Sequence, residues 1–268
     1  MGLLEDLGRK DYLAPLVRRI NEGSLVLKGD KLYLGDSINN SSPELVWLFG
    51  RMAPDRNCYR WFRIYLANFH FIPRECFGCW KVVVKPRTLT QLLKIYEYQQ
   101  KHKTIGKCGI ETRPFATYKG WYSAFWYCPL GEGLAKAKEI HTEVETMIRL
   151  NIGMDVPVIL KRACTEMEEE FGPSENWVYP PAVDKMQDAL DEFLEVKTQF
   201  IKQPPMYHNH IKLLWLKHAF EKGDPTAADH CDNFPRSFGV QPTTTYHGKK
   251  VEIADRRGVD GVSKIQRI

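Results

Sequence analysis

The sequence predicts an α+β fold centred on a ferredoxin-like unit, in which strands and helices follow one another as β-α-β-β-α-β. Three observations lead to this prediction. The 268 residues are 43% hydrophobic and 26% charged, which is enough apolar material for a buried core. Between residues 80 and 164, short β-branched or aromatic runs alternate with longer amphipathic ones. Two of the short runs follow each other without a helix between them, which indicates a hairpin inside the unit.

The predicted central unit spans residues 76–175. Its strands are expected at 80–86, 107–114, 121–128 and 156–164, and its helices at 88–102 and 134–152. Thr88 stands where it can cap the first helix. In this fold the four strands lie in the order 4-1-3-2, and both helices cover one face of the sheet.

The flanking regions are expected to be simpler. Residues 1–75 predict a small mixed subdomain, with a hairpin over 24–35 and a short helix that begins after Pro43 and carries Leu48 and Phe49. Residues 176–222 predict C-terminal helices, because apolar residues recur there at helical spacing. Residues 223–268 lack such a period and predict an extended basic tail.

Charge is concentrated near the C-terminus. The formal net charge is +5, and residues 236–268 contain seven basic and three acidic side chains, so the remainder of the chain is nearly neutral. A basic extension on a neutral body favours docking on a protein partner or on a second copy of the chain. Nucleic acid is the less favoured partner, because the body would add little charge to such an interface.

The start of the chain predicts a cytoplasmic protein that does not enter the membrane. Two acids follow in Met1-Gly2-Leu3-Leu4-Glu5-Asp6, where a secretory leader would have basic and then apolar residues. No apolar run approaches the roughly 18 residues that a membrane helix needs.

Cysteines give the strongest functional signal. The chain has seven, and in a reducing compartment metal binding or catalysis explains them better than disulfides do. Five fall between residues 76 and 164: Cys76, Cys79, Cys108, Cys128 and Cys164. In the predicted topology the first two precede strand 1, Cys108 begins strand 2, and the last two end strands 3 and 4. Because these strands are antiparallel neighbours, we expect all five thiols at one edge of the sheet.

The expected cofactor is an iron–sulfur cluster, with zinc as the alternative. Cys76-x-x-Cys79 suits either metal centre, but structural zinc sites usually draw on a second such pair, which the chain lacks. Aromatic neighbours such as Phe77 and the Cys128-Pro129 dipeptide also favour a cluster. The predicted metal ligands are Cys76, Cys79, Cys108 and Cys128, with Cys164 as a fifth cofactor-binding thiol. Simple core packing of the single cysteines is the competing interpretation, and Cys58 and Cys231 are not expected to bind metal.

Glu111 and Arg113 are the predicted catalytic pair, since they lie two apart on a strand close to the cysteines and so share a face. The sequence therefore predicts an iron–sulfur protein in redox or sulfur-transfer chemistry. It leaves open whether the protein is an enzyme. A second hypothesis is a zinc-stabilised nucleic-acid-binding protein whose Trp121, Phe125 and Tyr127 stack on bases. A third is a structural or assembly subunit that docks through its C-terminal tail.

Overall fold

The computed structural model describes residues 14–23, 25–28, 31–34, 46–51, 53, 56, 58, 61, 65–66, 69–111, 120–193, 203–230, 245–246 and 249–250. The chain divides into two compact units that interleave along the sequence. The first unit comprises residues 1–43, 55–79 and 162–200, and the second comprises residues 44–54, 80–161 and 201–268.

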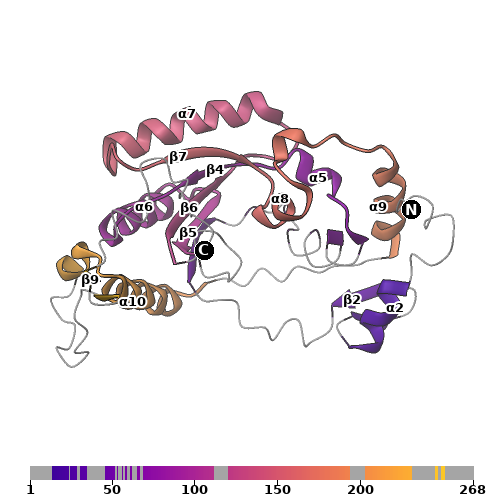
Figure 1. The fold of residues 1–268 in the computed structure, drawn as a ribbon, viewed down its shortest axis with the longest axis horizontal. Coiled ribbons are helices and arrows are strands. Elements are labelled where there is room, and N and C mark those ends of the chain that lie inside the picture. The colour runs from indigo at the N-terminus through magenta and orange to yellow at the C-terminus, as the bar shows by residue number, and fades with distance from the viewer. Residues whose placement is uncertain are drawn as a thin grey trace. The chain divides into compact units, whose positions relative to one another are not determined.

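A five-stranded sheet forms the centre of the second unit (Figure 1). In spatial order its strands are β3 (Trp47–Arg51), β5 (Gly106–Ile110), β6 (Tyr122–Tyr127), β4 (Trp80–Val84) and β7 (Val158–Arg162). The pairs β3–β5, β5–β6 and β6–β4 are antiparallel. Along the chain, β4, α6, β5, β6, α7 and β7 follow one another. A mixed helix and strand protein with an antiparallel sheet is thus confirmed.

Three helices cover one face of this sheet: α6 (Leu89–Lys101), α7 (Gly133–Asn151) and α10 (Pro205–Lys222). As predicted, Thr88 caps α6, and its Oγ1 accepts a hydrogen bond of 3.3 Å from the amide of Gln91. Alternation along the strands directs every second side chain toward the helices. The core between the layers includes Leu48, Val82, Val84, Ile110, Ala124, Trp126, Leu92, Ile95, Ile148 and Trp215.

Strand β3 corrects the short helix expected after Pro43. The alternation of Trp47, Leu48 and Phe49 fits an added edge strand, in which Leu48 enters the core while its neighbours take the other face. Gly109 on β5 makes this pairing possible, because a Cβ at that position would lie 2.0 Å from the carbonyl oxygen of Val46. Tertiary pairing therefore overrides the local capping signal.

The first residues of the predicted extended tail are folded. Residues Pro225–His230 form the short helix η4, and Asp224 and Ala227 are 1% and 0% exposed. Asp224 Oδ2 accepts hydrogen bonds from the Leu89 amide (2.6 Å) and the Tyr122 hydroxyl (2.9 Å). Specific polar contacts, rather than an apolar period, hold this segment. Farther along, β8 (Thr245–Tyr246) pairs with β9 (Lys249–Lys250).

The first unit holds smaller elements. Helix α2 (Ala14–Asn21) precedes the antiparallel hairpin of β1 (Leu25–Lys28) and β2 (Lys31–Leu34), which confirms the hairpin expected over 24–35. Further elements among the described residues of this unit are α5 (Arg74–Phe77), α8 (Thr165–Phe171), η3 (Ser174–Asn176) and α9 (Ala182–Phe193). Tyr65 and Phe71 stack with their ring centroids 5.3 Å apart.

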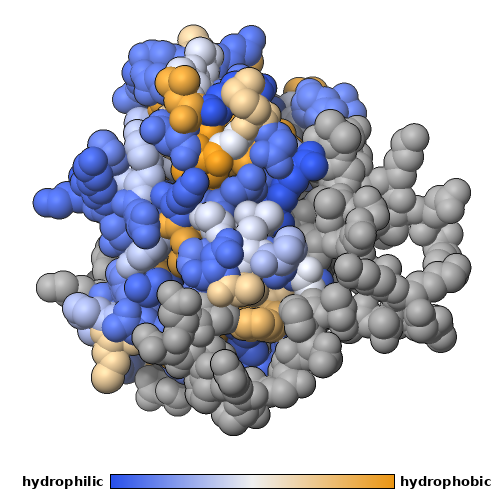
Figure 2. Space-filling model, turned by 90° about the vertical axis from the view of Figure 1, so that its left-hand side faces the viewer, coloured by the Kyte–Doolittle hydropathy of each residue, from blue (hydrophilic) through white to orange (hydrophobic). Residues whose placement is uncertain are grey.

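Figure 2 shows apolar residues in small separate patches among hydrophilic ones on the face that it presents. Among the exposed apolar side chains of the second unit are Leu150 (79% exposed) and Met154 (71%). Within the described part of the chain, none of the helices combines the length and the apolar character needed to cross a membrane.

Candidate metal centre

The Cys76-x-x-Cys79 pair lies on a single helical turn of the first unit. Helix α5 begins after Pro73, whose carbonyl accepts from the Cys76 amide at 2.9 Å. At the other end, the amide of Cys79 donates to the carbonyl of Cys76 at 3.3 Å, so the chain turns tightly between the two thiols. Cys76 and Cys79 are only 2% and 3% exposed. The two thiols are therefore buried one helical turn apart, and their binding of a metal stays a prediction.

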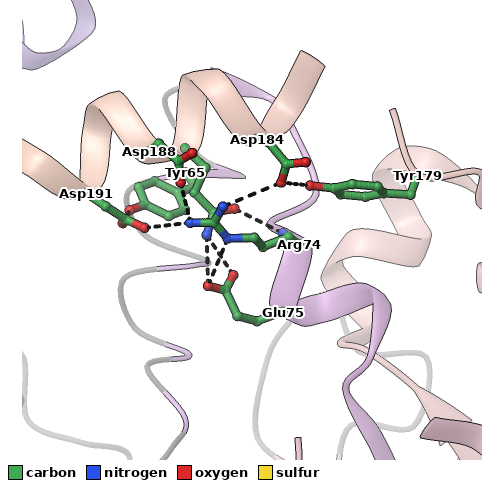
Figure 3. A network of polar contacts seen from close by, with 8 residues as sticks. Tyr65, Arg74, Glu75, Tyr179, Asp184, Asp188 and Asp191 are labelled. Atoms are coloured by element: carbon green, nitrogen blue, oxygen red, sulfur yellow. Dashed lines mark hydrogen bonds and ion pairs between the residues drawn. The ribbon is translucent and has the colours of Figure 1, made fainter. Parts of the chain in front are cut away.

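Helix α9 fixes the start of α5 through the network in Figure 3. The Arg74 guanidinium lies between carboxylates of α9, at 2.7 Å from Asp188, 3.3 Å from Asp191 and 3.4 Å from Asp184. Its pKa is raised, above all by the hydrogen bond with Asp188. Gln187 binds both the Arg74 amide, at 3.0 Å, and the Glu75 carboxylate. Arg74 and Glu75, the two residues before Cys76, are thus both anchored to α9.

Arg162 supports the turn from its other side. Its Nε donates to the Phe77 carbonyl at 2.7 Å, and its Nη1 donates to the Ser174 carbonyl at 3.0 Å. The guanidinium lies 5.4 Å from the centre of the Phe77 ring. Trp177 and Tyr179 approach the same ring edge-on, at 6.0 and 4.9 Å between centroids. The turn between the two cysteines is therefore held among aromatic rings.

A third arginine contacts a sulfur atom directly. Arg56 Nη1 donates a hydrogen bond to Cys79 Sγ at 2.5 Å, and Arg56 is 9% exposed. A guanidinium beside a thiol favours the thiolate form, which is the form that binds metals. This contact could not be predicted from the sequence, because the two residues are 23 positions apart and no motif joins them.

Cys164 and Cys58 lie close to this pair. The Ala163 amide donates to the Cys79 carbonyl at 2.7 Å, which brings the next residue, Cys164, to the same end of the unit. Burial raises the pKa of Cys76, and the neighbouring thiols of Cys164, Cys79 and Cys58 raise it further. The structure thus groups three predicted cysteines and adds Cys58, which is exposed.

The four thiols are grouped but do not form a ready coordination shell. Among the described residues, no three histidine, cysteine, aspartate or glutamate side chains are arranged so that they could hold a metal ion.

Cys108 and Cys128 belong to the second unit. Cys108 was expected at the beginning of its strand, but it is the third of the five residues of β5 and is 0% exposed. Burial alone raises its pKa, and its neighbours are core residues. Cys128 follows β6, where its amide donates to the Trp80 carbonyl at 3.1 Å. Cys231 lies outside the described residues.

The predicted catalytic pair is described only in part. Glu111 is 1% exposed and follows β5, where its amide donates to the Trp121 carbonyl at 2.9 Å. By strand alternation it shares a sheet face with Ser123 and Lys85, whose Nζ donates to Ser123 Oγ at 3.1 Å. Arg113 lies outside the described residues, so the pairing itself stays a prediction.

On the sheet face opposite the helices, the aromatic side chains already contact neighbouring side chains. Phe125 is 8% exposed, and the ammonium groups of Lys81 and Lys107 lie 5.6 and 5.5 Å from its ring centre. Lys107 also lies 4.3 Å from the centre of the Trp47 ring. Tyr127 stacks beside Phe125 at 6.4 Å. These contacts use the ring surfaces that base stacking would need, and so they do not favour the nucleic-acid hypothesis.

Comparisons with known proteins identify no relative. The chain matches no family model, no curated protein and no solved structure. The arrangement of the thiols is therefore the main guide to function.

Proposed function

We propose that the chain is an iron–sulfur protein whose cluster is bound in the first unit by the thiolates of Cys58, Cys76, Cys79 and Cys164. The observation that carries this proposal is the buried Cys-x-x-Cys turn, which has a guanidinium donor on one of its sulfur atoms and whose Cys76 interacts electrostatically with Cys164 and Cys58. Cys108 is omitted from the proposed ligands because it lies among core residues in the middle of β5, and Cys128 is omitted because it is not among the thiols that raise the pKa of Cys76.

The charges around the turn support this assignment. A centre held by thiolates is negatively charged, and burying such a charge is costly without nearby cations. Arg56 contacts Cys79 Sγ, and Arg162 lies over the Phe77 ring between the two cysteines. Hydrogen bonds to sulfur and positive charge close by are also the means by which proteins tune such clusters.

A cluster explains the pattern better than zinc does. Only one close cysteine pair is present among the four thiols, and the other two are distant from it in sequence, whereas structural zinc sites usually combine two close pairs. Phe77, Trp177 and Tyr179 would limit the access of water to one side of the centre. Electron transfer is the expected role when four thiolates bind, and sulfur transfer or substrate binding becomes accessible if Cys58 leaves one iron open.

Metal binding would change the protonation of the cysteines in the site. The raised pKa of Cys76 means that its thiol is protonated in the metal-free protein at neutral pH. Metal binding therefore has to release protons, and part of the binding free energy becomes folding free energy of the first unit.

Three broader features belong to the same proposal. The strand order β5-β6-β4-β7, with α6 and α7 on one face, supports a ferredoxin-like unit extended by β3. Dependence on reduced thiols supports a cytoplasmic location. An electron-transfer protein needs a partner, and the basic residues after position 235 support a protein with an acidic surface or a second copy of the chain.

Anaerobic reconstitution tests the proposal. Metal-free protein is incubated with ferrous iron, sulfide and zinc in separate samples, and bound metal and visible absorption are measured. We expect iron and sulfide to be retained with a brown colour, and to be largely lost in Cys76→Ser, Cys79→Ser and Cys164→Ser. Cys108→Ala, which removes a thiol from the other unit, is the matched control and should retain its iron.

Two outcomes would overturn the proposal. One is a colourless protein that retains zinc but not iron, which would indicate a zinc site. The other is equal loss of iron in Cys108→Ala and Cys76→Ser, which would show that the ligands do not come from the first unit alone.

A further inference from the structure

We propose that a groove on helix α7 binds the basic segment of residues 256–268 from a second copy of the chain. This α7 groove lies within the second unit and is lined by Tyr98 of α6 and by one face of α7, which includes Glu139, Glu143, Met147 and Leu150. The inference rests on the proposed function only in its choice of partner, and it does not depend on the metal centre.

The α7 groove is large enough for several side chains and offers them apolar surface. Its volume is about 750 Å³, within the range of about 300–1,000 Å³ that is common for binding sites. Tyr98, Met147 and Leu150 supply apolar atoms to its lining. Leu150 is 79% exposed, so a single chain leaves this side of the groove open.

The neutral polar side chains of the α7 groove bond to α7 itself. Thr142 Oγ1 donates to the carbonyl of Lys138 at 3.1 Å, and Thr146 Oγ1 donates to the carbonyl of Thr142 at 2.9 Å. Asn151 Nδ2 donates to the carbonyl of Met147 at 2.9 Å. Because these donors already have acceptors, an occupant is stabilised mainly by burying apolar groups against the lining.

Both charged side chains that line the α7 groove are acidic. Glu139 pairs with Lys136 at 2.8 Å, but both side chains are exposed, and such a pair contributes little and exchanges readily. Within the part of the chain that the structure describes, Glu143 makes neither a hydrogen bond nor an ion pair. Two carboxylates beside an apolar surface favour an occupant that is both basic and apolar.

The basic segment has this character. Residues 256–268 contain four basic side chains and one acidic side chain. Val262 and Ile265 flank Lys264, and Arg267 follows two positions later, so apolar and basic side chains alternate. The apolar ones match the lining of the α7 groove and the basic ones match its two carboxylates. Since every copy has both a groove and a segment, two identical chains can supply the whole contact.

Charge reversal in the full chain tests the proposal. The groove variant has Glu139→Lys and Glu143→Lys, and the segment variant has Lys264→Glu and Arg267→Glu. Sedimentation velocity over a range of concentrations measures the self-association of each protein. We expect the wild type to self-associate, and the dissociation constant to rise about tenfold or more in each variant, because like charges then face each other.

Mixing the two variants distinguishes a second copy from the segment of the same chain. In a pair made of one groove variant and one segment variant, each groove meets a segment of opposite charge. The equimolar mixture should therefore associate about as strongly as the wild type, although neither variant does so alone. If the segment instead docks on its own chain, mixing brings no recovery, and that result would overturn the proposal.

Glu132→Lys combined with Glu169→Lys is the matched control, because it reverses two exposed acids outside the α7 groove. The control should associate like the wild type. A wild type that is monomeric at every concentration would overturn the proposal, as would unchanged association in the groove and segment variants or equal weakening in the control. Iron plays no part in these measurements, so failure to bind iron would overturn the proposed metal centre and leave this proposal standing.

Discussion

At the scale of single residues, the thiols separate into those that face other thiols and those that face the core. Cys76 has a pKa raised by burial and by three neighbouring thiols, whereas burial alone raises the pKa of Cys108. The sequence distinguishes these cases poorly, because buried cysteine is common in both settings. Proximity among thiols that are distant in sequence becomes visible only when the chain is folded.

The raised pKa of Cys76 predicts that the metal-free protein loses stability in alkaline solution. In the unfolded chain the thiol ionises near pH 8.5, and in the folded chain it ionises well above its ordinary value. Above about pH 8.5 the folded state therefore binds more protons than the unfolded state, and the free energy of unfolding falls as pH rises. One pH unit above the unfolded pKa, the loss from this group is about 1 kcal/mol.

Urea denaturation of metal-free protein between pH 7.5 and 9.5 measures this loss. Cys76→Ala should show a decline smaller than that of the wild type by about the same amount, about 1 kcal/mol. Parallel curves for the two proteins would show that the Cys76 thiol ionises as readily in the folded chain as in the unfolded one.

At the scale of elements, α5 is too short to be stable by itself and depends on α9. An isolated helix of four residues cannot offset the cost of nucleation. The ion pairs of Arg74 and the hydrogen bonds of Gln187 supply the missing stabilisation (Figure 3). The carboxylates recur along α9 as Asp184, Asp188 and Asp191, which places them on one helix face.

Removal of the Arg74 guanidinium should therefore weaken the first unit. Arg74 and its partners are partly exposed, and solvent screening keeps each pair small, so we expect Arg74→Ala to cost about 1–2 kcal/mol for the whole network. Urea denaturation in low salt and in 1 M salt measures the effect, which should shrink in high salt as the charges are screened. Arg74→Lys is the control that retains the charge but loses the forked geometry, and it should cost less. A cost of Arg74→Ala that does not depend on salt would indicate lost packing instead.

Sequence patterns predict some of the helices and strands but not others. The β-branched run over β4 and the capped amphipathic run over α6 predict their own structure, because local preference and tertiary packing agree there. Residues 47–51 do not predict their own structure. They form a strand because they pair with β5, which is more than 50 positions away in the sequence, and because Gly109 has no side chain to block this pairing. In the same way, the Cys-x-x-Cys turn was predictable, but the approach of Arg56 and Cys58 was not.

At the scale of the whole molecule, the two units interleave, so neither is a continuous segment that could fold from its own stretch of sequence. The second unit draws its core from residues as distant as Leu48 and Ala227. The segment from Asp224 to His230 also packs into this unit. The buried carboxylate of Asp224 anchors it, where apolar side chains usually anchor such a segment.

This arrangement predicts that two truncations differ sharply. A chain ending at Lys222 lacks Asp224 and leaves the buried Leu89 amide and Tyr122 hydroxyl without their acceptor. Since hydrogen bonds to a charged group contribute about 1.5–3 kcal/mol each, we expect the chain ending at Lys222 to be less stable than one ending at His230 by about 3 kcal/mol or more. Thermal and urea unfolding of the two truncated chains measure the difference, and Asp224→Ala in the full chain should reproduce most of it. Equal stability of the two truncated chains would contradict the prediction, because it would mean that the Asp224 contacts contribute nothing net to the core that α6 and β6 share with η4.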